Sequence, residues 1–204
     1  SESQIIARLL AMESGIDLTR IVRGQIEDNE WERLAGAHGR ISEASLFIDD
    51  SSFSIGQIRA NIRQMQAEGK LDLVIIDDLR MIEGSQSLGR KLDRSDIVRE
   101  IKAIAKDCRI PIVLVAQTEE GRPRCMSASP WIASLEELGN IEEVADVVAL
   151  LHREDQFDPL SEKRELAEVR ILKHRHGRQG IAVLRFFDRT ARFTDLELYP
   201  GPGV

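Results

Sequence analysis

The sequence predicts an α/β fold with a mostly parallel central sheet flanked by helices and with antiparallel strands at the C-terminal end. Two apolar runs, residues 71–76 and 110–116, are rich in Val and Ile, as in parallel strands covered on both faces. Residues 93–106 between them have the apolar spacing of a crossover helix. Three late segments separated by turn-like residues predict the antiparallel strands: 169–172, 181–186 and 192–194.

The N-terminal part predicts two helices and a short strand. Residues 4–12 place apolar side chains at helical spacing, and a second helical stretch follows Asp28 and runs towards Gly39. Residues 46–48 form a short apolar run before two aspartates, which predicts a strand.

Residues 54–68 predict a further helix with a defined start. Ser54 and Gln57 have the S-x-x-Q spacing of a capping box, and the apolar positions that follow recur every three or four residues. Further on, residues 119–130 have the composition of a loop and residues 147–151 that of another strand. This order of strands and helices is the one expected of a RecA-like nucleotide-binding core.

Length and composition predict one domain, residues 1–199, followed by a flexible tail at residues 200–204. No apolar run is long enough to cross a membrane, no secretory leader precedes the first helix, and the two cysteines favour a reducing, cytoplasmic setting. The net charge of −7 does not attract nucleic acid, so a DNA contact requires a local basic strip.

The first candidate site residue is Asp77, which ends the apolar run at residues 71–76. An acid at the carboxyl end of a parallel strand lies where α/β folds bind ligands, and it can hold the water shell of Mg²⁺ beside a nucleotide. The alternative is that Asp77 only caps the next segment.

The second candidate is Gln117, at the end of the neighbouring predicted strand. Its amide can contact a γ-phosphate or orient water, and the alternative is a polar strand end in solvent.

A basic hairpin, residues 170–178, is the third candidate in this acidic chain. Alternation places Lys173 and Arg175 on one side of the strand, where they could reach a neighbouring subunit's nucleotide as an arginine finger does. The alternatives are a solvated basic turn and a metal site built from His152, His174 and His176, for which the spacing is a weak signal.

Taken in order, these pieces resemble the C-terminal motor domain of DnaB-like replicative DNA helicases over nearly the whole chain. The matching stretches are residues 44–50, 55–68, 73–77, 110–117, 139–142, 145–150 and 172–177. The resemblance implies a RecA-like fold, a ring of subunits, expected to be a hexamer, and ATP hydrolysis with translocation on single-stranded DNA.

The resemblance also implies roles for individual residues. Asp77 matches the Mg²⁺-associated acid, Gln117 the sensing amide, and Lys173 and Arg175 the pair supplied to the adjacent subunit's ATP. The loop that meets DNA phosphates through its backbone is matched by four consecutive residues: Glu137, Leu138, Gly139 and Asn140.

The sequence departs from the family pattern near these positions. The phosphate-binding loop G-x-x-x-x-G-K-[ST] and the catalytic glutamate are expected just upstream of Ser1, and neither occurs in the sequence, so we expect the chain alone not to hydrolyse ATP. Asp78 replaces the usual aromatic residue, Arg80 a glutamine, and Glu136 an arginine, while residues 118–120 replace a Leu-Ser-Arg run.

The resulting hypothesis is the motor domain of an ATP-dependent replicative DNA helicase that uses ATP and Mg²⁺. Its expected partners are single-stranded DNA, copies of itself in a ring, and a helicase loader or primase, with no membrane. The alternatives are a non-catalytic ring or loader-binding paralogue that keeps the fold, and a RecA-like ATPase of another kind, such as a clock or recombination regulator.

Overall fold

The computed structural model describes residues 1–82, 94–117, 141–158 and 160–196. By its internal contacts the chain forms two compact units. The first unit comprises residues 1–50, 149–171 and 180–204, and the second comprises residues 51–148 and 172–179. The predicted loop at residues 119–130 and the predicted tail at residues 200–204 lie outside the described residues.

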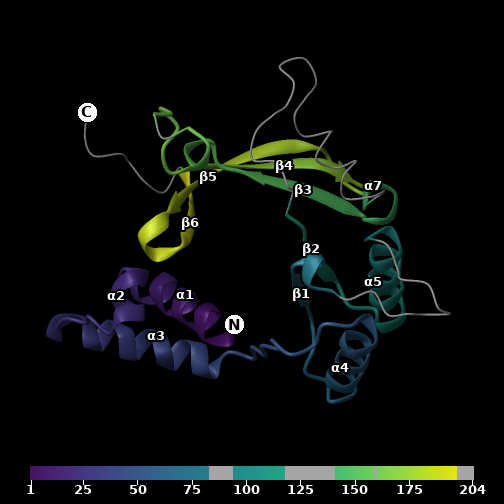
Figure 1. Ribbon diagram of the computed structural model, residues 1–204, viewed down its shortest axis with the longest axis horizontal. Coiled ribbons are helices and arrows are strands. Elements are labelled where there is room, and N and C mark those ends of the chain that lie inside the picture. Colours follow the sequence, from purple (N-terminus) through teal and green to yellow (C-terminus); the bar gives the residue numbers. More distant parts are fainter. Residues whose placement is uncertain (83–93, 118–140, 159, 197–204) are drawn as a thin grey trace. The chain divides into compact units, whose positions relative to one another are not determined.

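The second unit contains the predicted parallel strands and the helix that joins them. Strands β1 (Val74–Asp77) and β2 (Ile112–Val115) pair in parallel, with α5 (Arg94–Cys108) between them in the chain. Figure 1 shows α4 (Ile55–Ala67) and α5 beside this strand pair. The parallel pairing and the crossover helix are confirmed, and each strand is shorter than its apolar run.

One face of the β1–β2 pair packs on the core of this unit. Ten buried residues form that core, half of them isoleucines of α4 and α5, and Ile104 is only 1% exposed. The opposite face carries Ile75, which is 64% exposed, and Val113. The expectation that both faces are covered is therefore wrong for the described residues, because the single crossover helix can cover only one face.

Helix α4 begins where the capping box predicts. Oγ of Ser54 accepts a hydrogen bond from the backbone N–H of Gln57 at 3.3 Å, and Oε1 of Gln57 accepts one from the backbone N–H of Ser54 at 3.1 Å. These two bonds satisfy two donors that have no partner inside the helix, which sets its first turn.

Three helices open the first unit: α1 (Glu2–Ser14), α2 (Leu18–Arg23) and α3 (Trp31–Glu43) (Figure 1). Helices α1 and α3 are confirmed, whereas the short α2 was not predicted. The predicted strand at residues 46–48 is wrong, because these residues adopt neither strand nor helix. An apolar run becomes a strand only when a neighbouring strand supplies hydrogen-bond partners, and none of the described residues does so here.

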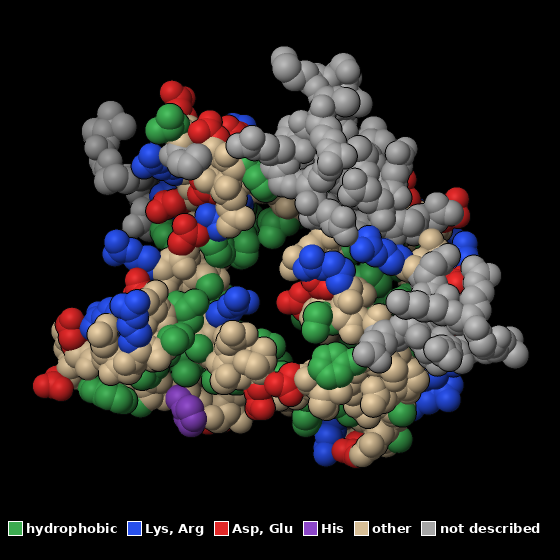
Figure 2. All heavy atoms as spheres, viewed as in Figure 1, with side chains coloured by type: hydrophobic (Ala, Val, Ile, Leu, Met, Phe, Trp, Pro, Cys, Tyr) green, Lys and Arg blue, Asp and Glu red, His purple; other side chains and the backbone are tan. Residues whose placement is uncertain are grey.

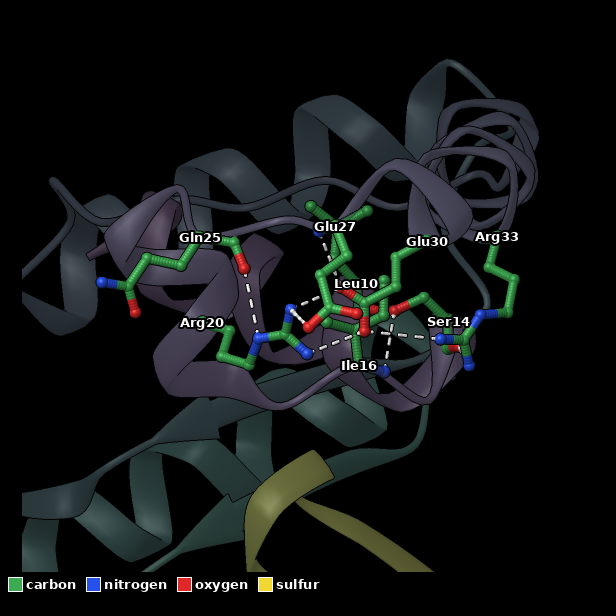
Figure 3. Close-up of polar contacts among 8 residues, drawn as sticks. All are labelled: Leu10, Ser14, Ile16, Arg20, Gln25, Glu27, Glu30 and Arg33. Atoms are coloured by element: carbon green, nitrogen blue, oxygen red, sulfur yellow. Dashed lines mark hydrogen bonds and ion pairs between the residues drawn. The ribbon is translucent and has the colours of Figure 1, made fainter.

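An ion-pair network stabilises the connection between these helices (Figure 3). The guanidinium of Arg20 donates two hydrogen bonds to the carboxylate of Glu30, at 2.9 and 2.8 Å, and one to Glu27 at 3.0 Å. Glu30 also accepts from the backbone N–H of Glu27 at 3.0 Å, and its side chain is only 8% exposed. A buried carboxylate needs such partners, so this network fixes the path from α2 to α3.

The late part of the chain forms a four-stranded sheet in the order β3 (Val147–His152), β4 (Leu166–His174), β5 (Gly180–Phe187) and β6 (Arg192–Asp195). The pairs β4–β5 and β5–β6 are antiparallel, as predicted. The α/β class with antiparallel strands at the C-terminal end is therefore confirmed. Its parallel part contains two strands among the described residues, fewer than a mostly parallel sheet implies.

Hydrophobic side chains remain visible on the surface beside charged ones, as Figure 2 shows for one face. Trp31, Phe47 and Ile75 are among the large apolar residues that are exposed. Of the helices that the structure describes, none is both long and apolar enough to span a membrane.

Candidate functional site

Asp77 and Gln117 lie at the same edge of the β1–β2 pair. The strands run in parallel, with Asp77 opposite Val115, and Gln117 follows two residues after Val115. Both side chains therefore belong to the carboxyl ends of adjacent strands, and the predicted juxtaposition is confirmed. This edge is where parallel α/β sheets bind ligands.

The carboxylate of Asp77 is available to a ligand. Its side chain is exposed, and within the described residues it makes no hydrogen bond or ion pair. Strand alternation places it on the same face as the exposed Ile75, away from the packed core. An exposed carboxylate without a counter-ion can accept hydrogen bonds from the water shell of a magnesium ion.

Arg80 connects the end of β1 to the end of β2. Its Nη2 lies 2.9 Å from Oδ2 of Asp78 and also donates a hydrogen bond to Oε1 of Gln117. The amide oxygen of Gln117 is engaged, whereas its Nε2 has no partner among the described residues and can donate to an acceptor such as a phosphate oxygen. Arg80 thus orients the amide at the candidate nucleotide edge.

Asp78 and Arg80, the two departures from the family pattern beside Asp77, are partners of each other. The Asp78 side chain is only 7% exposed, and its Oδ1 accepts a hydrogen bond from the backbone N–H of Arg80 at 2.8 Å. The hydrogen bond from the Arg80 guanidinium lowers the pKa of Asp78, outweighing the effect of burial, which raises it. Asp78 is therefore ionised at neutral pH.

Lys173 and Arg175 of the basic hairpin both contact the segment around α7 (Ile141–Val144). Nζ of Lys173 donates a hydrogen bond to the backbone carbonyl of Glu142. Arg175 contacts Asp146 twice: its backbone N–H donates to the carbonyl at 2.9 Å, and its Nη1 donates to the carboxylate at 3.0 Å. The two predicted cations are therefore anchored close together in the chain that carries them.

Asp146 also accepts a hydrogen bond from Nζ of Lys102, which belongs to α5. The hydrogen bond from Lys102, followed by the one from Arg175, lowers the pKa of Asp146 to about 2. Its carboxylate is consequently charged at any pH near neutrality. We call Lys102, Asp146 and Arg175 the hairpin triad.

Two further sets of predicted positions remain: the DNA-contacting residues, which the structure does not describe, and the three histidines of the metal alternative, which it does not support. Glu137, Leu138, Gly139 and Asn140, the predicted DNA-contacting residues, lie outside the described residues. For the metal alternative at His152, His174 and His176, the described part of the chain contains no cluster of three or more His, Cys, Asp or Glu side chains able to hold a metal ion.

Sequence reasoning gave no role to Arg80, Lys102 or Asp146. For Arg80 the sequence did carry a signal. Positions 78 and 80 both depart from the family pattern, and together they replace an aromatic residue and a glutamine by an acid and a base, which can form an ion pair. Lys102 and Asp146 are 44 positions apart and carried no such signal.

Comparisons with known proteins address the family and the fold of the chain. The family model described as DnaB-like helicase C terminal domain matches residues 1–195. The replicative DNA helicase DnaC of Bacillus subtilis is 32% identical over 197 residues, which are 95% of this chain and 43% of that protein. The replicative DNA helicase DnaB of Geobacillus stearothermophilus is 32% identical over 200 residues, 97% of this chain and 44% of that protein.

Two solved structures have the same fold as this chain. One, described as an ATPase domain, has a TM-score of 0.86 and 28% identity, over 96% of this chain and 71% of that one. The other, a DnaB-like replicative helicase described with its interactions with primase, has a TM-score of 0.86 and 27% identity, over 96% and 49%. The chain thus spans less than half the length of the two curated relatives.

Proposed function

Because the chain belongs to the DnaB-like helicase C-terminal domain family, we propose that it is the motor domain of an ATP-dependent replicative DNA helicase. The observation that carries this proposal is the position of Asp77 and Gln117 at one edge of adjacent parallel strands. An acid and an amide donor at this edge match the needs of a metal-bound nucleoside triphosphate.

The described residues fit part of a magnesium nucleotide site. Asp77 would hold the hydrated ion through its exposed carboxylate, and Nε2 of Gln117 would donate to the terminal phosphate. The bound ion would neutralise charge that develops on the phosphates during hydrolysis. The rest of the phosphate cradle would come from a G-x-x-x-x-G-K-[ST] loop in the full-length protein.

The same proposal gives Lys173 and Arg175 a role between subunits. In a ring, the hairpin of one subunit would approach the nucleotide of the next, and Arg175 would stabilise negative charge in the transition state. This role favours a ring-shaped homo-oligomer, for which we propose a hexamer. Single-stranded DNA would contact the backbone of residues 137–140.

A primase is a proposed partner because the DnaB-like helicase with a TM-score of 0.86 is described with its primase interactions. We propose a helicase loader as a further partner.

ATPase activity of the full-length protein, measured with and without single-stranded DNA, tests this function. We expect DNA to stimulate turnover and Asp77→Asn to lower kcat by at least about 10²-fold, because the ion would lose its carboxylate. Asp72→Asn is the matched control: it removes one exposed carboxylate just before β1, at the other end of the strand, and should leave turnover unchanged.

Two outcomes would contradict the proposal. A full-length protein without ATPase activity would favour the non-catalytic ring or loader-binding paralogue. Equal turnover in wild type and Asp77→Asn would show that the edge of the β1–β2 pair that carries Asp77 is not the nucleotide site.

A further inference from the structure

We propose that Asp146 is a positioning residue for Arg175, holding its guanidinium so that one edge faces the nucleotide of the neighbouring subunit. The inference rests on the proposed function, because it assumes that Arg175 acts on that nucleotide. The inference goes beyond the proposed function because it gives a role to Asp146 and Lys102, which touch neither nucleotide nor DNA in that proposal.

The first argument is that Asp146 holds Arg175 at both its backbone and its side chain. The carbonyl of Asp146 accepts the Arg175 backbone N–H at 2.9 Å, which places the chain just after the end of β4. The carboxylate accepts Nη1 at 3.0 Å. An arginine held at its backbone and at one guanidinium nitrogen loses much of its rotational freedom before any ligand arrives.

The second argument is that Asp146 is itself held by a packed element. Lys102 donates to Oδ2 of Asp146, while Arg175 uses Oδ1, so each carboxylate oxygen has its own partner. Lys102 belongs to α5, whose residues Ile101 and Ile104 are buried in the core. Arg175 is therefore connected, through Asp146 and Lys102, to a helix that packs in the core of the same unit.

The third argument is that Asp146 leaves part of Arg175 available. Among the described residues, only Nη1 and the backbone N–H of Arg175 have hydrogen-bond partners. Nε and Nη2 lie along the other edge of the planar group, where they can donate in parallel to a phosphate. The triad contains two cations and one anion, so it keeps one excess positive charge for that ligand.

Exposure indicates that this contact has little effect on folding. The Arg175 side chain is 60% exposed and that of Asp146 is 48% exposed, and ion pairs at such positions contribute little to stability. A misplaced catalytic group, in contrast, lowers a reaction rate strongly even when the fold is intact. The contact is therefore better explained by the geometry of Arg175 than by stability.

A double-mutant cycle in the full-length protein tests the inference, with single-stranded-DNA-stimulated ATPase as the readout. We expect Asp146→Ala to lower kcat about tenfold while KM for ATP changes less than about twofold. In the Arg175→Ala background, Asp146→Ala should have no further effect, because both residues act through one guanidinium. Lys102→Ala should cause a smaller loss of kcat.

Glu143→Gln is the matched control, because it removes an exposed carboxylate of α7 that has no partner among the described residues. It should leave kcat unchanged, and thermal unfolding should be the same for wild type, Asp146→Ala and Glu143→Gln.

The outcomes separate this inference from the proposed function. If Arg175→Ala lowers turnover and Asp146→Ala does not, or if Asp146→Ala costs the same in both backgrounds, Asp146 does not position Arg175 and the function stands. Faster turnover in Asp146→Ala would show that the contact restrains Arg175, and would overturn the inference. If Arg175→Ala itself leaves turnover unchanged, the proposed role of Arg175 fails together with the inference.

Discussion

Arg80 donates a hydrogen bond from Nη2 to Oε1 of Gln117, which joins the turn after β1 to the end of β2. The same nitrogen forms an ion pair with Asp78, so the arginine cannot move without disturbing both contacts. A buried acid, an arginine and an amide therefore form one connected group at the edge where we propose that ATP binds. The strength of the contacts within this group decides how firmly the Gln117 amide is oriented.

The first prediction concerns the ion pair between Arg80 and Asp78. Arg80→Ala should lower the free energy of unfolding by about 1 kcal/mol, because the buried Asp78 carboxylate loses its charged partner but keeps its backbone hydrogen bond. Urea unfolding of the full-length protein measures this. The control is Arg99→Ala, which removes a pair with the half-buried Asp96 on α5 that is more exposed than the Arg80–Asp78 pair, and it should cost below about 0.5 kcal/mol. If Arg80→Ala and Arg99→Ala lose the same free energy of unfolding, the Arg80–Asp78 ion pair contributes no more to stability than a more exposed pair.

The second prediction concerns pH. The hydrogen bond from Arg80 lowers the pKa of Asp78 below 3.8, so the folded state favours the ionised carboxylate. The resulting stability is present above pH ~4 and is lost as the pH falls through the folded-state pKa. Asp78→Asn, which can still cap the following turn, should therefore lose less stability than wild type between about pH 6 and about pH 3. Parallel curves for the two proteins, obtained from urea midpoints, would exclude this contribution.

The third prediction concerns the network in the first unit (Figure 3). Glu30→Gln should destabilise the protein by about 1–3 kcal/mol, because the partly buried Arg20 loses its bidentate carboxylate partner. Arg40→Ala, which removes an exposed pair with Glu13, is the control and should cost less than about 1 kcal/mol. Midpoints of thermal or urea unfolding provide the comparison, and a reversed order would refute the prediction.

The fourth prediction concerns DNA. The resemblance to the family implies an arginine at position 136, where this chain has Glu136, so Glu136→Arg should strengthen single-stranded DNA binding by the full-length protein. It should also steepen the plot of log affinity against log salt by about 0.7 for each additional phosphate that the protein neutralises. Glu162→Arg makes the same charge change at an exposed position outside the segment 136–140 of the sequence and should have a smaller effect. Fluorescence anisotropy at several salt concentrations distinguishes the two variants, and equally strengthened binding would indicate bulk charge alone.

Local sequence signals predicted the elements that carry their own start and stop information. The capping box at Ser54 and Gln57 specified where α4 begins, and the apolar spacing of residues 93–106 predicted α5. The short α2 was missed because its six residues are too few for a periodic pattern, although Asp17 and Gly24 cap its two ends.

Elements that depend on a partner were predicted less well. The apolar run at residues 46–48 is not a strand, because pairing depends on a neighbour that the run itself does not encode. The exposed face at Ile75 has the same origin: an apolar strand sequence indicates a preference for burial, but only the surrounding elements decide whether that face is covered.

The sequence by itself determined the α/β class and the acid and amide at the ends of two successive strands, because hydrophobic periodicity and strand ends are local properties of the chain. Only the tertiary structure decided that Arg80 connects Asp78 with Gln117 and that Lys102 and Arg175 share Asp146. These contacts join side chains that are mostly distant in the sequence, and their geometry depends on how strands and helices pack, which no local pattern specifies.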